Sequence, residues 1–321
     1  MRRYVRGVLT ASALAALSGC SGGGGSAAPA NAAGAAAVSR SQAAAVLSKY
    51  QTGVGKAQQA LDAKALSTLE TGPQLQMDLA GFKLHQATRR KYVPTAYTSQ
   101  AFFIPRLTGF PRWFAADVAT DKGKLHQALL FTEQSASAPW LLAADPVESG
   151  GTPLPGIALD KDGLATPVTG AAALAVVPAK IAAAHAELLT AGPKSPGATG
   201  LAPGNQTSRA FSALQQARGG FGRQGVTLTT QFQPAGQPVY ALRTKDGGAV
   251  VWYVLQQRET YAAKKPGSLS ISGDLIGLAP PGKVKKQLDT TVLIQYLADV
   301  PAKGQANVSG IYRKAVQAVS R

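Results

Sequence analysis

The spacing of apolar residues predicts two helices at the start of the folded region. The residues that recur at helical spacing in the first of them are Val46, Tyr50, Val54, Ala57 and Leu61. Ser39 and Gln42 stand three residues apart just ahead of this pattern, which is typical of a capping box at a helix N-terminus. Gly72 and Pro73 interrupt the pattern, and a shorter apolar repeat over residues 75–82 predicts a second helix.

After Tyr97 the pattern changes from helical spacing to short apolar runs bounded by proline and polar residues. Such runs predict β-strands, and Pro105 and Pro111 fall between them, where proline is tolerated. The expected strands of this first half are residues 101–104, 113–119, 125–132 and 140–147.

The second half repeats the same order of helices first and strands afterwards. We expect helices over residues 179–189 and 207–217, with a Pro/Gly-rich loop at 192–204 between them. The expected strands are residues 226–232, 239–244, 249–257, 269–278 and 290–298. Residues 245–248 predict a tight hairpin, because glycine supplies the positive φ that such a turn needs.

The pattern therefore predicts an α+β fold of two domains. About 280 residues are more than one hydrophobic core normally holds, and a glycine- and proline-rich break lies at residues 149–156. Residues 120–133 can be aligned with 244–257, since each segment places a polar turn before a long apolar strand. This favours an internal duplication, although hairpins of this kind also arise by chance.

The N-terminus has the layout of a signal peptide. Arg2, Arg3 and Arg6 precede an uncharged apolar stretch at residues 7–17, which is too short to span a bilayer. The stretch ends in four residues that resemble the lipobox of bacterial lipoproteins: Leu17, Ser18, Gly19 and Cys20. The resemblance implies cleavage before Cys20 and a diacylglycerol on its sulfur. The alternative is a secreted protein with a chance cysteine.

This resemblance gives the domain boundaries and the location that we expect. They are a signal peptide at 1–19, a lipidated cysteine with a flexible tether at 20–38, a first domain at 39–148, a linker at 149–165 and a second domain at 166–321. The expected location is the outer face of the cell membrane, with fatty chains such as palmitate inserted in it. Cys20 is the one cysteine of the chain, so disulfides and thiolate metal sites are excluded, and no cofactor besides the covalent diacylglycerol is expected.

The basic charge of the chain favours a polyanionic partner. The sequence has 33 Lys and Arg against 16 Asp and Glu, and residues 166–321 carry most of the excess. On an exported protein such a charge favours anionic lipid or anionic wall polymer over nucleic acid. The candidate contact residues are Lys264, Lys265, Lys283, Lys285 and Lys286, and ordinary solvated loops are the alternative.

The sequence offers little catalytic chemistry. His85, His126 and His185 lack the spacing of paired metal ligands, and the chain has no nucleophile-elbow or phosphate-loop pattern. We therefore assign no catalytic or metal-binding residue. Asp117 and Asp121 could serve as a general base in a cavity, or they could be a strand edge and a solvated turn. The aromatic residues of both halves could line a pocket for an apolar ligand or form two cores.

The order of helices followed by a curved antiparallel sheet resembles the cone-shaped fold of the nuclear transport factor 2 and ketosteroid isomerase superfamily, here twice in tandem. Together with the lipobox and the hairpin at residues 243–253, the chain also resembles a group of uncharacterised lipoproteins of actinobacteria. The function we expect is a surface-anchored, non-enzymatic binding or interaction module. The alternatives are an isomerase or hydrolase with a cone-shaped pocket, and an envelope protein that binds anionic wall polymer.

Overall fold

The structure is a computed structural model that describes residues 34–121, 125–148, 151–170, 173–267 and 269–321, with the backbone alone for Lys283. Residues Gly34–Arg321 form one compact unit. The expected signal peptide, the lipobox with Cys20 and most of the tether lie outside the described residues.

The helices of the first half are fixed by local capping. Helix α1 (Arg40–Ala60) begins with the predicted capping box, in which Ser39 Oγ accepts from the Gln42 backbone N–H at 3.2 Å and Gln42 Oε1 accepts from the Ser39 N–H at 3.0 Å. Helix α2 (Ala63–Leu66) is one turn long and is capped by Asp62. Helix α3 (Gly72–Thr88) begins at the Gly-Pro pair that predicted a break, since proline is accepted in the first turn of a helix.

The strands of the first half are short. They are β1 (Ala35–Ala36), β2 (Tyr97–Phe103), β3 (Arg106–Leu107), β4 (Arg112–Thr120), β5 (His126–Glu133), β6 (Leu141–Ala144) and β7 (Val147–Glu148). Strand β1 pairs with β3, so the chain joins the fold at this small two-stranded sheet.

The second half contains longer elements. Its helices are α4 (Pro178–Ala191), the short 3₁₀ helices η1 (Pro196–Gly200) and η2 (Gly273–Leu275), and α5 (Ser208–Arg223). Its strands are β8 (Val226–Pro234), β9 (Tyr240–Arg243), β10 (Ala249–Ala263), β11 (Leu269–Ser270), β12 (Lys283–Val284), β13 (Gln287–Val300) and β14 (Asn307–Ser320).

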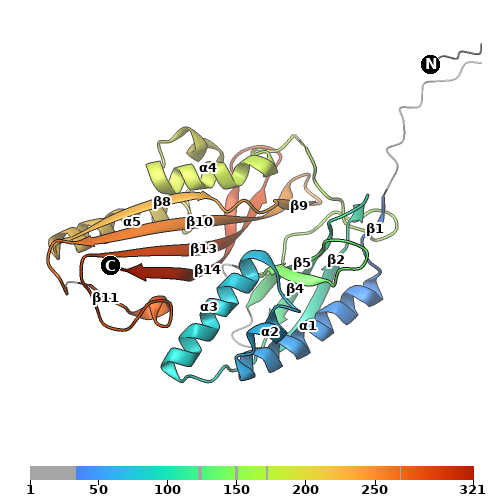
Figure 1. The fold of residues 1–321 in the computed structure, drawn as a ribbon. Helices are drawn as coiled ribbons and strands as arrows, with labels where there is room; N and C mark the ends of the chain where they lie inside the picture. Colours follow the sequence, from blue (N-terminus) through green and yellow to red (C-terminus); the bar gives the residue numbers. More distant parts are fainter. Residues whose placement is uncertain (1–33, 122–124, 149–150, 171–172, 268) are drawn as a thin grey trace, which may run out of the picture. The chain divides into compact units, whose positions relative to one another are not determined.

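The two halves share one sheet. Within the described residues, ten antiparallel strands follow the order β2-β4-β5-β7-β14-β13-β10-β8, with β6 paired to β5 and β9 paired to β10 (Figure 1). The last strands of the two halves, β7 and β14, are direct neighbours through the pairs Val147–Ile311 and Glu148–Gly310. The fold is thus α+β with helices before strands in each half, and it does not show a tandem duplication.

Three parts of the predicted strand pattern are wrong. Residues 140–147 are not one strand, because Asp145 and Pro146 separate β6 from β7. Residues 269–278 are not one strand, because Gly273 and Gly277 adopt positive φ values of 57° and 84° and break the extended backbone. Strand β14 was not predicted at all. Its alternation of apolar and polar residues is interrupted by two register shifts against β13, and Gly310 occupies a position where an added Cβ would lie 3.0 Å from Val147 O.

Each half has an apolar core of its own, and a further apolar cluster joins the halves. Helices α1, α2 and α3 cover one face of the first half through Tyr50, Phe114 and Phe131. Helices α4 and α5 cover the second half, where Tyr253 and Tyr296 are buried. The third cluster joins the two halves, and in it the Trp252 indole N–H donates to Ala128 O at 2.9 Å.

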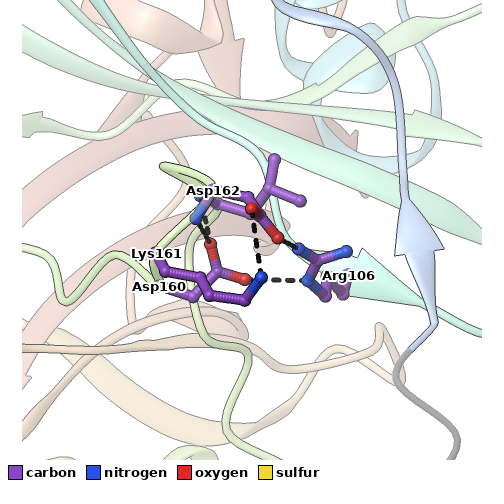
Figure 2. A network of polar contacts seen from close by, with 5 residues as sticks. Arg106, Asp160, Lys161 and Asp162 are labelled. Atoms are coloured by element: carbon purple, nitrogen blue, oxygen red, sulfur yellow. Dashed lines mark hydrogen bonds and ion pairs between the residues drawn. The ribbon is translucent and has the colours of Figure 1, made fainter.

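The segment predicted as a linker packs into the fold. Leu154, Ile157 and Ala165 are buried in the cluster between the halves. Arg106, which lies on β3, binds the carboxylates of Asp160 and Asp162 on either side of Lys161 (Figure 2), with Nε 2.8 Å from Asp160. Backbone N–H bonds and this guanidinium lower the pKa of Asp160. The turn at residues 160–164 is thereby attached to the first half.

Candidate functional site

A groove runs between helix α5 and the sheet of the second half. Its apolar walls come from Leu189, Phe232, Ile294 and Ile311, and from alanines and Leu214 of α5. The α5 residues that line the groove are mostly alanines, and their small side chains leave space between the helix and the sheet. None of the sixteen residues of α5 is fully buried. The cavity is about 360 Å³, which falls in the range of about 300–1,000 Å³ typical of small-molecule sites.

The groove has a polar end, formed by Gln257 and Glu259 on β10 and Arg313 on β14. The Glu259 carboxylate accepts from Gln257 Nε2 at 2.6 Å, Tyr261 Oη at 3.0 Å and Thr290 Oγ1 at 2.9 Å. Three donors therefore hold this buried carboxylate in place.

Arg313 completes the polar end of the groove. Its Nη2 lies 3.8 Å from Glu259 Oε1 and 3.4 Å from Gln257 Oε1, and its side chain is 43% exposed. A guanidinium carries five N–H donors, so Arg313 can also bind an acceptor group on a ligand in the groove. The arrangement suits binding of an apolar molecule with one polar end better than proton transfer, since the Glu259 oxygens are already engaged.

His185 on α4 lies at the base of this region as part of the core. Burial lowers its pKa to about 4, so the ring is neutral at pH 7. Nε2 donates to Gln206 O at 2.8 Å, and Nδ1 therefore accepts from Tyr253 Oη at 2.9 Å. These bonds fix the loop that carries Gln206, a groove residue, to the sheet.

Helix α3 packs against β14 (Figure 1). A second polar cluster lies at this contact. Tyr50 Oη donates to Glu70 Oε1 at 3.1 Å, and Tyr312 Oη donates to Asp78 Oδ1 at 2.9 Å. Burial, reinforced by Asp78 and Asp145, raises the pKa of Glu70 to about 10. Burial also raises the pKa of Asp78 and of Asp145. Glu70 is therefore a neutral carboxylic acid at pH 7.

Glu148 and Asp299 face an open polar cleft of about 460 Å³ at the junction of β7, β13 and β14. Burial, and then the charge of Asp299, raise the pKa of Glu148 to about 7. Ser309 Oγ donates to Glu148 Oε1 at 3.4 Å. A buried carboxylate beside a polar partner is what the expected enzymatic alternative would require, and the partner here is Ser309, with Thr152 also on the lining of the cleft.

The lysines that the sequence singled out come together at one end of the sheet. The Ala263 N–H donates to Lys286 O, and the Lys264 N–H donates to Gly225 O. Lys264, Lys265, Lys285 and Lys286 are therefore at adjoining strand ends, and their side chains are exposed. The side chain of Lys283 is outside the described residues.

The remaining residues considered from the sequence have structural partners. Asp117 accepts from His126 Nδ1 at 2.8 Å and from the Leu154 N–H at 2.9 Å. Asp121 accepts from the Ala96 N–H, and His85 stacks on Tyr92. Both oxygens of Asp117 are engaged, so it is not placed to act as a general base.

Two further properties concern the described residues alone. They contain no group of three or more His, Cys, Asp or Glu side chains suited to a metal ion. None of their helices combines the length and the apolar character needed to cross a bilayer.

Comparison with known proteins places the chain in a family. A family model described as a domain of unknown function, DUF8094, matches residues 35–320. The chain belongs to this family. The matched region covers all the described helices and the strands of the shared sheet, so the groove and both polar clusters lie within the family domain.

Proteins similar to this chain are named as lipoproteins. An uncharacterised lipoprotein of Streptomyces avermitilis is 33% identical over 282 residues, covering 84% of this chain and 81% of the relative. Two uncharacterised lipoproteins of Streptomyces coelicolor are 30% identical over 84% of the chain and 29% identical over 90% of it, and 82% and 86% of these relatives are covered. No solved structure matches the chain.

Sequence reasoning missed the polar end of the groove, although one signal was present. Gln257 and Glu259 share the period-2 face of β10 with Val251, Tyr253 and Leu255, which points toward α4 and α5. Polar residues that continue a buried face indicate an internal polar site. The position of Arg313 gave no such signal, because its strand was not predicted.

Proposed function

We propose that this member of the family is a surface-anchored lipoprotein whose folded part is a non-enzymatic binding module. The anchor is the diacylglycerol on Cys20, and its two chains suffice for stable insertion, since each buried methylene contributes about 0.8 kcal/mol. The lipoprotein names of the relatives and the lipobox-like residues 17–20 support this part of the proposal.

The ligand of this module is an elongated apolar molecule with an acceptor group at one end. The observation that carries the proposal is the groove beneath α5, with apolar walls along its length and Arg313 at its polar end. An acceptor such as a carboxylate can bind the guanidinium while the apolar part displaces water from the alanine-lined wall. The groove residues come from four strands and two helices of the second half, so the site is held by rigid elements.

An apolar carboxylate with a fluorescent group, 11-(dansylamino)undecanoate, tests the groove directly. Ala213 lies on the groove wall, and Gln216 is exposed on the same helix outside the groove. We expect the full chain to bind the probe with a dissociation constant on the order of 10 µM. Ala213→Phe should weaken binding at least tenfold by filling the groove, and Arg313→Gln should weaken it about tenfold by removing the charged donor.

The matched control for this experiment is Gln216→Phe, which adds the same ring outside the groove. Its probe affinity should stay within twofold of the wild type. Equal affinity in Ala213→Phe and Gln216→Phe would place the probe elsewhere and refute the groove as the binding site.

A second candidate function is contact with an anionic surface through the lysines at the end of the sheet. The adjacency of the 264–265 and 285–286 strand ends supports it, because like charges gathered at one end raise the local potential. Anionic lipid or anionic wall polymer is the expected partner, and nucleic acid is not expected for an exported chain.

Salt-dependent binding to vesicles of phosphatidylglycerol tests this second function. Replacing Lys264, Lys265, Lys283, Lys285 and Lys286 by Ala should weaken binding at least a hundredfold at low salt, since each lysine near the surface contributes about 1 kcal/mol. The control removes the same number of charges from the first half by replacing Lys49, Lys56, Lys64, Lys83 and Lys91, which are exposed. Equal losses in both variants would show that net charge alone acts. Binding that does not change with salt would rule out an electrostatic contact.

A further inference from the structure

The open polar cleft of about 460 Å³ lies where the two halves meet, and ligand sites are common at such junctions. Its walls come from β7 and the segment that follows it, from β13 and β14, and from the start of α5 with the loop before it. Within the part of the chain that the structure describes, the cleft and the groove beneath α5 share no lining residue. The two sites are therefore separate.

Two carboxylates give the cleft a negative wall. Glu148 on β7 and Asp299 on β13 both line it. Strand β14 lies between these strands and has a bulge at Ser309, because its neighbours Val308 and Gly310 pair with consecutive residues of β13. The bulge places Ser309 Oγ 3.4 Å from Glu148 Oε1. Side chains from three strands thus converge on this wall.

One oxygen of Glu148 is available to a ligand. The residue is 4% exposed, and its Oε1 accepts from Ser309. Its Oε2 has no hydrogen-bond partner among the described residues and is not one of the enclosed atoms that lack one, so it retains surface in the cleft. Burial and the charge of Asp299 raise the pKa of Glu148. A positive group in contact with both carboxylates would lower that pKa and would be held by them in turn.

Arg209, in the first turn of α5, adds a positive charge to the same cleft. Its Nη1 donates to Asn205 Oδ1 at 2.9 Å, and Asn205 is also a lining residue, so this bond holds the guanidinium at the cleft. No carboxylate among the described residues pairs with Arg209, and its remaining N–H donors are open to a ligand. Two parallel N–H donors of a guanidinium match the two oxygens of a carboxylate.

We propose that this cleft binds a small zwitterion of the amino-acid or dipeptide class. Its ammonium group contacts Glu148 and Asp299, and its carboxylate contacts Arg209. A metal cation would be repelled by Arg209, and a simple anion would be repelled by the two carboxylates. The volume falls in the range of about 300–1,000 Å³ typical of small-molecule sites. The cleft therefore selects a ligand that carries both charges.

Dipeptides blocked at one end test each charge separately. L-Alanyl-L-alanine, its N-acetyl form and its C-terminal amide are titrated into the full chain at pH 7, while the backbone N–H resonances of Val308 and Ser309 are followed. We expect the free dipeptide to bind with a dissociation constant on the order of 1 mM. Each blocked form should bind at least tenfold more weakly. No binding of the free dipeptide, or an equal affinity for either blocked form, would overturn the proposal.

Replacing Arg209 by Gln locates the carboxylate of the ligand. The variant should bind the free dipeptide about tenfold more weakly and should bind the C-terminal amide as the wild type does, because the amide has no charge to lose to Arg209. Arg223→Gln is the matched control, since Arg223 is exposed at the other end of α5 and outside the cleft. Equal effects of the two variants would overturn this contact.

Replacing Glu148 by Gln locates the ammonium group. The variant should weaken binding of the free dipeptide about tenfold and leave the N-acetyl form unchanged. Asp299→Asn should act in the same way, and it tests the same wall if Glu148→Gln does not fold. An unchanged affinity in both folded variants would contradict the assignment. Ala213→Phe should leave dipeptide binding unchanged, which separates this site from the groove beneath α5.

Discussion

At pH 7 a Glu70→Gln variant is expected to be more stable than the wild type by about 3 kcal/mol. The pKa of Glu70 is raised from its usual 4.5 to about 10 by burial and by its neighbours Asp78 and Asp145. The folded protein therefore holds a proton that the unfolded chain releases at pH 7. Each pKa unit between 4.5 and 7 costs about 1.4 kcal/mol of stability, and glutamine removes this cost because it has no proton to lose.

The raised pKa of Glu70 also determines the pH range over which the wild type loses stability. A carboxyl group with a raised folded-state pKa contributes its full stability below pH 4.5, and this contribution is lost as the pH rises toward 10. The wild type should lose stability across this window, and Glu70→Gln should lose less. The other titratable groups that face the cluster are Tyr50, Asp78, Tyr92, Tyr97, Asp145, Tyr312 and Lys314, so some pH dependence remains in the variant.

Denaturant titrations between pH 4 and pH 9 measure this difference. Glu187→Gln is the control, because Glu187 is an exposed residue of α4, and its stability curve should follow the wild type. The quantity to compare is the stability of Glu70→Gln minus that of the wild type. If this difference is smaller at pH 7 than at pH 4, Glu70 is ionised in the folded protein.

Replacing Cys20 by Ser is expected to release the protein from the membrane fraction or to leave it uncleaved. Serine cannot receive the thioether-linked diacylglycerol, so both acyl chains are lost. A single acyl chain binds a membrane only marginally, and the loss of both removes the anchor completely. Fractionation of cells followed by mass spectrometry of the N-terminus measures the outcome.

Ser26→Ala, in the expected tether, is the control for this experiment. It should keep the wild-type distribution and an N-terminus that starts at modified Cys20. Unchanged membrane retention of Cys20→Ser, with cleavage at the same bond, would rule out the lipid anchor and leave the lysines at the end of the sheet to explain the association.

The sequence predicts best those elements that depend on local interactions. The capping box at Ser39 and Gln42 and the helix that follows it are confirmed, because both bonds join residues three positions apart. The hairpin before β10 is also confirmed, since Gly247 adopts a φ of 84° in its turn. These features are determined within a few residues of chain.

The central part of the fold depends on distant residues and was not predictable in this way. Strand β14 lies between β13 and β7, and its irregular alternation reflects its register shifts and its glycine contact with Val147. A local pattern contains no information about such neighbours. The expected boundary between halves fell in a glycine- and proline-rich segment whose Leu154 and Ile157 are nevertheless buried.

The candidate sites also differ in whether they depend on local sequence or on residues far apart in the chain. The lysine clusters could be selected because each is contiguous in sequence, and the structure adds that they adjoin. The groove and the Glu70 cluster each combine side chains from elements far apart in the chain. Gln295 Nε2, for example, donates to Gln74 Oε1 across 221 positions. No spacing rule identifies such a pair.

Because β7 pairs with β14, the last strand of the chain, the shared sheet cannot be completed until the end of the chain has been made. Glu148 and its partner Ser309 are 161 positions apart, and a ribosome adds about 5–20 residues per second. Strand β7 therefore lacks its neighbour β14 for on the order of ten seconds during synthesis. An exposed strand edge invites pairing with other chains, so this edge is open to such pairing until β14 has been made.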